Sequence, residues 1–102
     1  MLAFMETTLN QDEVFFALEP PLRRQLLGLL ARGKPLTVSE MAEETQRDPD
    51  LVSKHLRVMR DAGIVTSERD TGRDGRMQVY EIPDQFVTEP GTVDLGFCVL
   101  RF

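Results

Sequence analysis

Basic and hydroxyl side chains recur at helical spacing along the segment 49–61. Lys54 and Arg57 share one side of this segment with Ser53 and Arg60. The opposite side is apolar, formed by Val52, Leu56 and Met59. Guanidinium and ammonium groups donate hydrogen bonds to guanine O6 and N7 and to phosphate oxygens, and serine can reach either. Such a face is often only a solvated surface, so the surrounding elements decide whether it binds nucleic acid.

These elements predict a helix-turn-helix. Asp48 is a good N-cap, Pro49 suits the first helical position, and Ala62-Gly63 supplies a stop, so a helix is expected between them. A shorter helix should run from a cap at Thr37 or Ser39 through Glu44. Only about four residues, 45–48, then connect the two helices, which is the connection length of this motif.

A β-hairpin is expected directly after the second of these helices. The run 64–69 predicts a strand and 78–82 its partner. Between them, 70–75 contains Gly72 and Asp74-Gly75, which provide turn chemistry. Arg69, Arg73 and Arg76 cluster around this tip, although the aspartates there could neutralise them. A helix-turn-helix followed by a basic hairpin is the winged-helix arrangement.

The side chains expected to contact double-stranded DNA follow from this arrangement. A recognition helix enters the major groove N-terminus first, and wing residues contact the backbone or the adjacent minor groove. The predicted contacts are Gln46, Arg47, Asp50, Ser53, Lys54, Arg57, Arg73 and Arg76. Lys54 and Arg57 are expected to dominate, and Asp50 could accept a hydrogen bond from cytosine N4.

The remaining elements are less distinctive. Helices are expected over 12–18 and from Pro21 to a stop at Gly33, and 34–37 is too short for more than a connector or a single-bridge strand. Residues 83–92 hold two prolines and a glycine, which predicts a surface loop. Alternating side chains over 93–102 predict a last strand. The fold class is therefore mainly α, a winged helix-turn-helix with an extra C-terminal strand.

Charge is distributed unevenly along the chain. The protein carries 12 Lys and Arg against 17 Asp and Glu, a net charge of −5 that by itself opposes phosphate binding. The stretch 47–76, however, holds seven basic and six acidic residues, and the rest of the chain holds five and eleven. An acidic body with one basic surface favours a defined orientation on DNA.

Composition limits the other function classes. Cys98 is the single cysteine and His55 the single histidine, so neither a disulfide nor a Ser/His/Asp or Cys/His catalytic set is expected, and we predict no enzyme. We expect His55 to pack or to donate or accept a hydrogen bond, and Cys98 to be a small buried apolar residue. No apolar run approaches membrane-spanning length and no secretory signal is recognised, which predicts a cytoplasmic protein.

Two stretches resemble the ArsR-type repressors, the arsenical-repressor family. Phe16-Ala17-Leu18 with Pro20-Pro21-Leu22-Arg23 resembles the family's "F-x-A-L-x-D-P-x-R" opening. Leu51-Val52-Ser53-Lys54-His55-Leu56 with Val58 to Val65 resembles its "V-S-x-H-L-x-x-L-x-x-A-G-L-V" recognition helix and strand entry. The resemblance covers roughly 14–82 and implies a transcriptional regulator.

The sequence departs from the metal-sensing members of that family. Where they carry "L-C-V-C-D-L", this chain has Leu36-Thr37-Val38-Ser39-Glu40-Met41, so hydroxyls stand in place of both thiolates. The C-terminal segment contains no histidine for the family's second zinc site. Asp48, Pro49 and Asp50 also stand where family members usually have small polar residues at the start of the recognition helix. We therefore expect no metal and no cofactor. The alternatives for the inducer are a small molecule, a partner protein, oxidation of Cys98, or none.

Apolar residues at the two ends of the chain predict a homodimer. Phe4, Phe15 and Phe16, together with 93–102, are more apolar than a monomer of this fold can cover. A two-fold dimer predicts a pseudo-palindromic operator. We expect 1–82 to form the DNA-binding domain with an N-terminal dimerisation segment, and 83–102 to form a linker and strand at the dimer contact. The function expected is a DNA-binding repressor, and the alternative is a winged-helix protein-interaction module.

Overall fold

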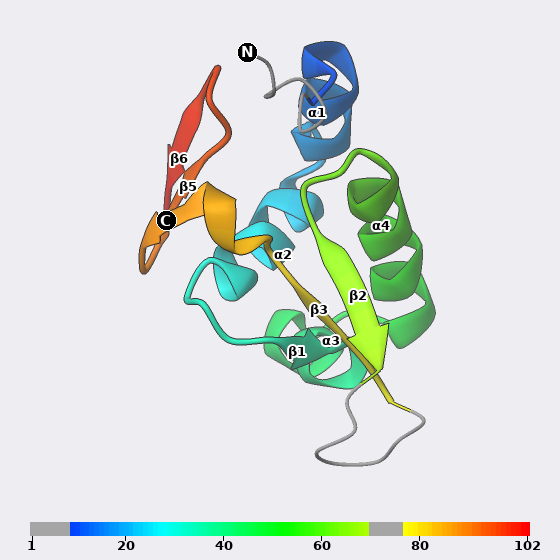
Figure 1. Ribbon diagram of the computed structural model, residues 1–102. Coiled ribbons are helices and arrows are strands. Elements are labelled where there is room, and N and C mark those ends of the chain that lie inside the picture. Colours follow the sequence, from blue (N-terminus) through cyan, green and yellow to red (C-terminus); the bar gives the residue numbers. More distant parts are fainter. Residues whose placement is uncertain (1–8, 70–76) are drawn as a thin grey trace.

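The computed structural model describes residues 9–69 and 77–102 (Figure 1). Four α-helices occupy most of its first part: α1 Gln11–Leu18, α2 Pro21–Leu30, α3 Val38–Thr45 and α4 Pro49–Asp61. The strands and the short 3-10 helix η2 are β1 Leu36–Thr37, β2 Thr66–Arg69, β3 Gln78–Glu81, η2 Asp84–Phe86, β4 Val87–Glu89, β5 Thr92–Asp94 and β6 Val99–Arg101. The predicted winged helix-turn-helix is confirmed.

Local capping explains where the helices begin. The Thr37 side chain accepts a hydrogen bond from the Glu40 backbone N–H at 3.1 Å, and the Glu40 carboxylate accepts one from the Thr37 N–H at 2.8 Å. This reciprocal pair is a capping box and selects Thr37 over Ser39 as the cap of α3. Asp48 caps α4 and Pro49 is its first residue, as predicted. Both helices of the helix-turn-helix therefore begin at a capping side chain.

The wing sheet has the strand order β1-β3-β2 and is antiparallel throughout. Thr66 pairs with Glu81 and Arg69 with Gln78, so β2 and β3 form the predicted hairpin. β2 begins at Thr66 and not at Ile64 as expected, because the Ile64 N–H donates to the Met59 carbonyl at 3.2 Å in the turn that ends α4. The hairpin tip with Arg73 and Arg76 lies outside the described residues. In Figure 1, β2 and β3 run away from α1 toward the opposite end of the molecule.

The C-terminal part differs from the sequence prediction. Residues 83–92, expected to form a surface loop, contain η2, β4 and the start of β5, and Phe86 is buried. The predicted strand 93–102 is interrupted, because a turn closed by a 2.9 Å hydrogen bond from the Leu95 N–H to the Cys98 carbonyl separates β5 from β6. Gly96 has φ 94°, which only glycine adopts readily. A second antiparallel sheet, β4-β5-β6, replaces the single strand.

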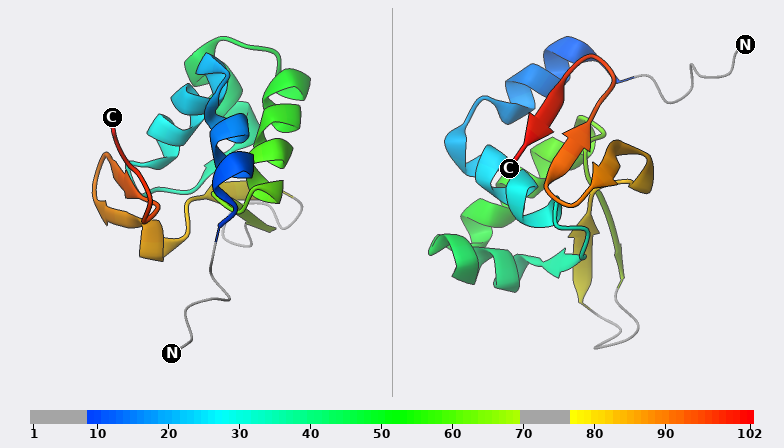
Figure 2. Two further views of the ribbon diagram at one scale, coloured as in Figure 1. Left: turned by 90° about the horizontal axis from the view of Figure 1, so that it is seen from above. Right: turned by 90° about the vertical axis from the view of Figure 1, so that its left-hand side faces the viewer.

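This second sheet belongs to the same hydrophobic core as the helices. Val93 and Leu95 are buried in one cluster with side chains from all four α-helices. The Phe15 and Phe97 rings meet edge to face with centroids 5.5 Å apart, which joins α1 to the β5–β6 turn. Figure 2 shows β5 and β6 beside α1 and α2. The C-terminal segment is therefore an integral part of the packing and not an appended strand.

Candidate nucleic-acid interface

The rotation of α4 about its axis is determined by its buried stripe. Val52, Leu56 and Met59 are completely buried, as their spacing predicted. Because these three side chains point into the core, the residues between them must face outward. Lys54 and Arg57 are exposed and Ser53 is half-buried. The helix thus presents the predicted basic face to solvent.

This basic face is not neutralised by the neighbouring acidic residues. The Asp48 carboxylate accepts a hydrogen bond from the Asp50 N–H at 3.1 Å and serves as the helix cap. Among residues 9–69 and 77–102, no ion pair joins Lys54 or Arg57 to Asp48 or Asp50. The Arg57 Nη2 group instead lies 3.5 Å from Ser53 Oγ, one turn earlier on the same helix. Both cations therefore remain available to an external anion.

The turn before α4 is held by backbone hydrogen bonds. Gln46 adopts the left-handed conformation with φ 56° and ends α3, and the Arg47 N–H donates to the Ala42 carbonyl at 3.0 Å. The side chains of Gln46, Arg47 and Asp50 are all exposed. These three predicted contacts consequently lie beside the first turn of α4, the part of a recognition helix that enters the groove.

The sequence analysis missed a hydrogen-bonded link between α4 and the two helices behind it. Arg23, in α2, donates from Nε to Nδ1 of His55 at 2.8 Å. Its Nη1 group also approaches the Phe16 and Ala17 carbonyls at the end of α1, at 3.5 and 3.4 Å. One arginine therefore joins α1, α2 and α4. Arg23 and His55 are 32 residues apart, so no local pattern could have paired them.

The Arg23–His55 hydrogen bond requires a neutral imidazole. The nitrogen that accepts the Arg23 proton has no proton of its own, whereas a protonated histidine would present a donor to a donor. Burial, and then the positive charge of Arg23, lowers the pKa of His55 below its ordinary value of 6.5. The prediction that His55 forms a hydrogen bond is therefore confirmed, and its partner is an arginine.

Protonation of His55 is expected to make stability depend on pH. Because its pKa is lower in the folded state, the contribution of His55 is complete above the unfolded-state pKa near 6.5 and is lost as the pH falls from there toward the folded-state pKa. Urea unfolding at pH 7.5 and 5.5 should show a larger loss of stability for the wild type than for His55→Gln, which keeps an acceptor but does not titrate. Equal losses would contradict this role.

Comparison with known proteins identifies the family. The family described as bacterial regulatory protein, arsR family, matches residues 20–67. An HTH-type transcriptional regulator of Methanocaldococcus jannaschii is 31% identical over 85 residues, which span 83% of this chain and 91% of that protein. The chain belongs to the ArsR family. It is a helix-turn-helix transcriptional regulator.

Two solved ArsR-family structures have the same fold. The crystal structure of an ArsR family transcriptional regulator is 32% identical, with a TM-score of 0.62, and the alignment covers 74% of this chain and 77% of that one. A homodimeric winged helix-turn-helix DNA-binding domain from Mycobacterium bovis, a possible ArsR-family regulator, is 30% identical with a TM-score of 0.66. That alignment covers 76% of this chain and 67% of the other.

In this ArsR-family chain, one of the two positions that lack a thiolate has a structural role. Thr37 is buried and its hydroxyl caps α3, while Ser39 is exposed. Cys98 is half-buried against the core, and burial followed by the nearby Asp94 raises the pKa of its thiol. A raised pKa lowers the fraction of reactive thiolate at neutral pH.

Over the described ranges, no group of three or more His, Cys, Asp and Glu side chains could hold a metal ion, and no helix could span a membrane.

Proposed function

We propose that this ArsR-family regulator is a repressor that binds a pseudo-palindromic DNA operator as a homodimer, with α4 in the major groove. The observation that carries the proposal is the pair of exposed cations, Lys54 and Arg57, on the side of α4 opposite its buried stripe. Repression follows from occupying a promoter and excluding polymerase. Because its partner is chromosomal DNA, we place the protein in the cytoplasm.

Each predicted contact has a distinct role in this proposal. Lys54 and Arg57 donate to guanine O6 and N7, and Asp50 accepts from cytosine N4. Gln46 and Arg47 of the turn, together with Ser53 on α4, bind phosphates and orient the helix. Arg73 and Arg76 of the wing, outside the described residues, would contact the backbone or the minor groove. Base readout is thus assigned to Asp50, Lys54 and Arg57, and positioning to the other predicted contacts.

The dimer contact is proposed on the surface shared by α1 and β6. Phe15 is 51% exposed, Phe16 65% and Val99 45%, and exposed large apolar side chains of this kind mark an interaction surface when they are contiguous. The M. bovis relative is described as homodimeric, which supports the same assembly. We propose that 1–82 carry DNA binding and an N-terminal dimer segment, and that 83–102 contribute to the contact. In Figure 1, α1 and β6 lie at the end of the molecule opposite the one toward which β2 runs.

Phe16→Ser with Val99→Ser is expected to convert the dimer into a monomer in sedimentation. Both side chains are exposed, so their replacement should leave the core intact. Deleting 93–102 would be a poor test, because Val93 and Leu95 belong to the core. Leu51→Ser, at an exposed apolar position in the first turn of α4, is the matched control and should remain dimeric. Unchanged assembly of the double variant would place the dimer contact elsewhere.

Selection of bound fragments from random DNA tests the function itself. The full chain should enrich two inverted half-sites whose centres are one or more helical turns apart. Enrichment of a single half-site would contradict the dimeric mode. No enrichment of any sequence would overturn the DNA-binding proposal and favour a protein-interaction module.

A further inference from the structure

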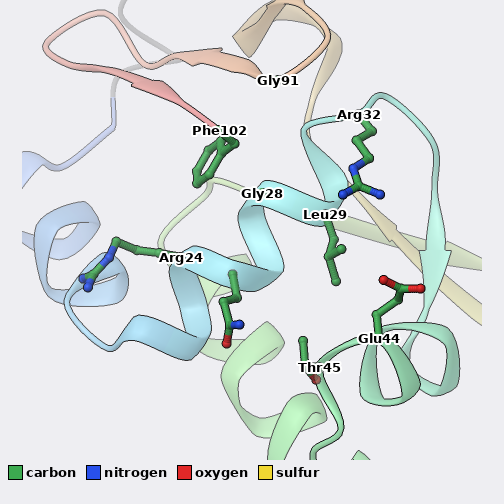
Figure 3. A pocket seen from close by; sticks show the side chains of 9 residues that line it. Arg24, Gly28, Leu29, Arg32, Glu44, Thr45, Gly91 and Phe102 are labelled. Atoms are coloured by element: carbon green, nitrogen blue, oxygen red, sulfur yellow. The ribbon is translucent and has the colours of Figure 1, made fainter.

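A groove of about 310 Å³ lies on the outer side of α2, between the end of α3 and the C-terminal sheet. Its lining includes charged, aromatic and small residues, and Figure 3 shows them from close by. A volume of this size is at the lower end of the range for small-molecule sites. No residue that we expect to contact DNA lines this groove, so DNA binding does not account for its presence.

Two opposite charges face each other across one end of the groove. Arg32 comes from the turn after α2 and Glu44 from the last turn of α3, and their charged groups point toward each other in Figure 3. Within the described part of the chain, no ion pair joins them and neither makes a hydrogen bond through its side chain. Arg24, by contrast, donates to the Leu18 and Glu19 carbonyls at 2.8 and 2.6 Å. Arg32 and Glu44 are therefore the charges that a ligand could engage.

The other end of the groove is apolar. The Phe102 ring packs over Gly28, where an added Cβ would lie 2.9 Å from the ring. The Phe102 N–H donates to the Gly91 carbonyl at 2.7 Å, which ties the position of this residue to the β4–β5 turn. The half-buried Leu29 lines the groove between this end and the charged end. The absence of a side chain at Gly28 is what allows the ring to form this wall.

The groove also adjoins the element that positions the recognition helix. Glu44 and Thr45 are the last two residues of α3, and Gln46 and Arg47 of the turn follow directly. The Thr45 hydroxyl donates back to the Met41 carbonyl at 2.8 Å, which holds this last turn in place. A molecule bound between Arg32 and Glu44 would therefore contact α2 and the start of the turn at the same time.

We propose that this groove binds a small zwitterion, a free amino acid with an apolar side chain, and that its binding alters the affinity for DNA. The carboxylate would pair with Arg32, the ammonium group with Glu44, and the side chain would pack on Phe102 and Leu29. A plain anion would meet Glu44 and a plain cation would meet Arg32, so neither satisfies both charges. The regulatory half of this proposal rests on the proposed function, whereas ligand binding does not.

Calorimetry on the full chain without DNA tests the site directly. The probes are L-leucine, L-phenylalanine, and the two analogues of L-phenylalanine that keep one charge each, phenethylamine and 3-phenylpropanoate. At least one amino acid should bind, and L-phenylalanine should bind about ten-fold or more tightly than either analogue, because each analogue leaves one charge of the groove unpaired. Absence of binding by both amino acids, or equal binding of all three phenyl probes, would overturn the site.

Variants locate the binding and separate it from DNA recognition. Arg32→Gln and Glu44→Gln should each weaken amino-acid binding about ten-fold, while Arg60→Gln and Glu13→Gln, exposed residues that do not line the groove, should leave it unchanged. If Arg32 and Glu44 merely pair with each other, both variants lose stability and no probe binds, which refutes the proposal. Amino-acid binding that leaves operator affinity unchanged would refute the regulatory half. A chain that binds the amino acid and no DNA refutes the proposed function alone.

Discussion

Replacing Lys54 and Arg57 together by alanine is expected to lower affinity for the selected operator by about two to four orders of magnitude. Each cation that reads a guanine contributes about 1–3 kcal/mol, and about 1.4 kcal/mol corresponds to a ten-fold change in affinity. Both side chains are exposed, so their removal should leave the thermal unfolding curve close to that of the wild type. The weaker binding would then reflect recognition and not folding.

Fluorescence anisotropy at fixed salt measures this effect, with Lys34→Ala as the control. Lys34 is an exposed lysine between α2 and β1, outside the recognition helix and outside the proposed dimer contact. Its replacement also removes one positive charge. If net charge alone determined DNA affinity, this variant would lose as much affinity as Lys54→Ala or Arg57→Ala. For each phosphate that a variant no longer neutralises, the slope of log affinity against log salt should become shallower by about 0.9. If the double variant kept wild-type affinity, α4 could not be the recognition helix.

Val93→Ala is expected to lower the free energy of unfolding by about 2 kcal/mol. The side chain is completely buried in the core cluster, although it lies in the C-terminal sheet. Removing its two methyl groups forfeits their transfer free energy and leaves a cavity that the surrounding side chains fill only in part. A decrease of this size is a large fraction of the stability of a small domain.

Val99→Ala is the matched control in the same sheet. Val99 is 45% exposed, so the identical change there should alter stability by no more than about 0.5 kcal/mol. Because Val99 belongs to the proposed dimer surface, urea unfolding should be measured at two protein concentrations to separate assembly from folding. If the two valine variants were equally destabilised, the second sheet would not be part of the core.

The elements that sequence analysis predicted correctly are those whose signals are local. The cap at Asp48, the proline at position 49 and the stripe Val52, Leu56 and Met59 all act within a few residues of one another. Capping and helical periodicity depend on neighbours three or four residues away, so they can be recognised without the fold. The basic face of α4 follows from the same spacing, since one side of the helix must be buried.

The C-terminal sheet was not predicted, although the turn residues between its strands are visible in the sequence. Alternation over 93–102 continues through the turn at Gly96, so periodicity alone could not show where the strand breaks. The Asp94 side chain accepts a hydrogen bond from the Gly96 N–H at 2.9 Å, a turn pattern typical of aspartate. Pro90-Gly91 marks the turn before it in the same way. The three short strands β4, β5 and β6 were therefore interpreted from the sequence as one loop followed by one strand.

By itself, the sequence determined the four helices, the hairpin after them and the cationic face of α4, because capping, periodicity and turn chemistry act over short distances. Only the tertiary structure decided that Arg23 donates to His55, that Val93 enters the helical core, and that Arg32 and Glu44 face each other across a groove. These contacts join residues far apart in the chain. Their formation depends on how the elements pack in three dimensions, and no spacing along the sequence encodes that packing directly.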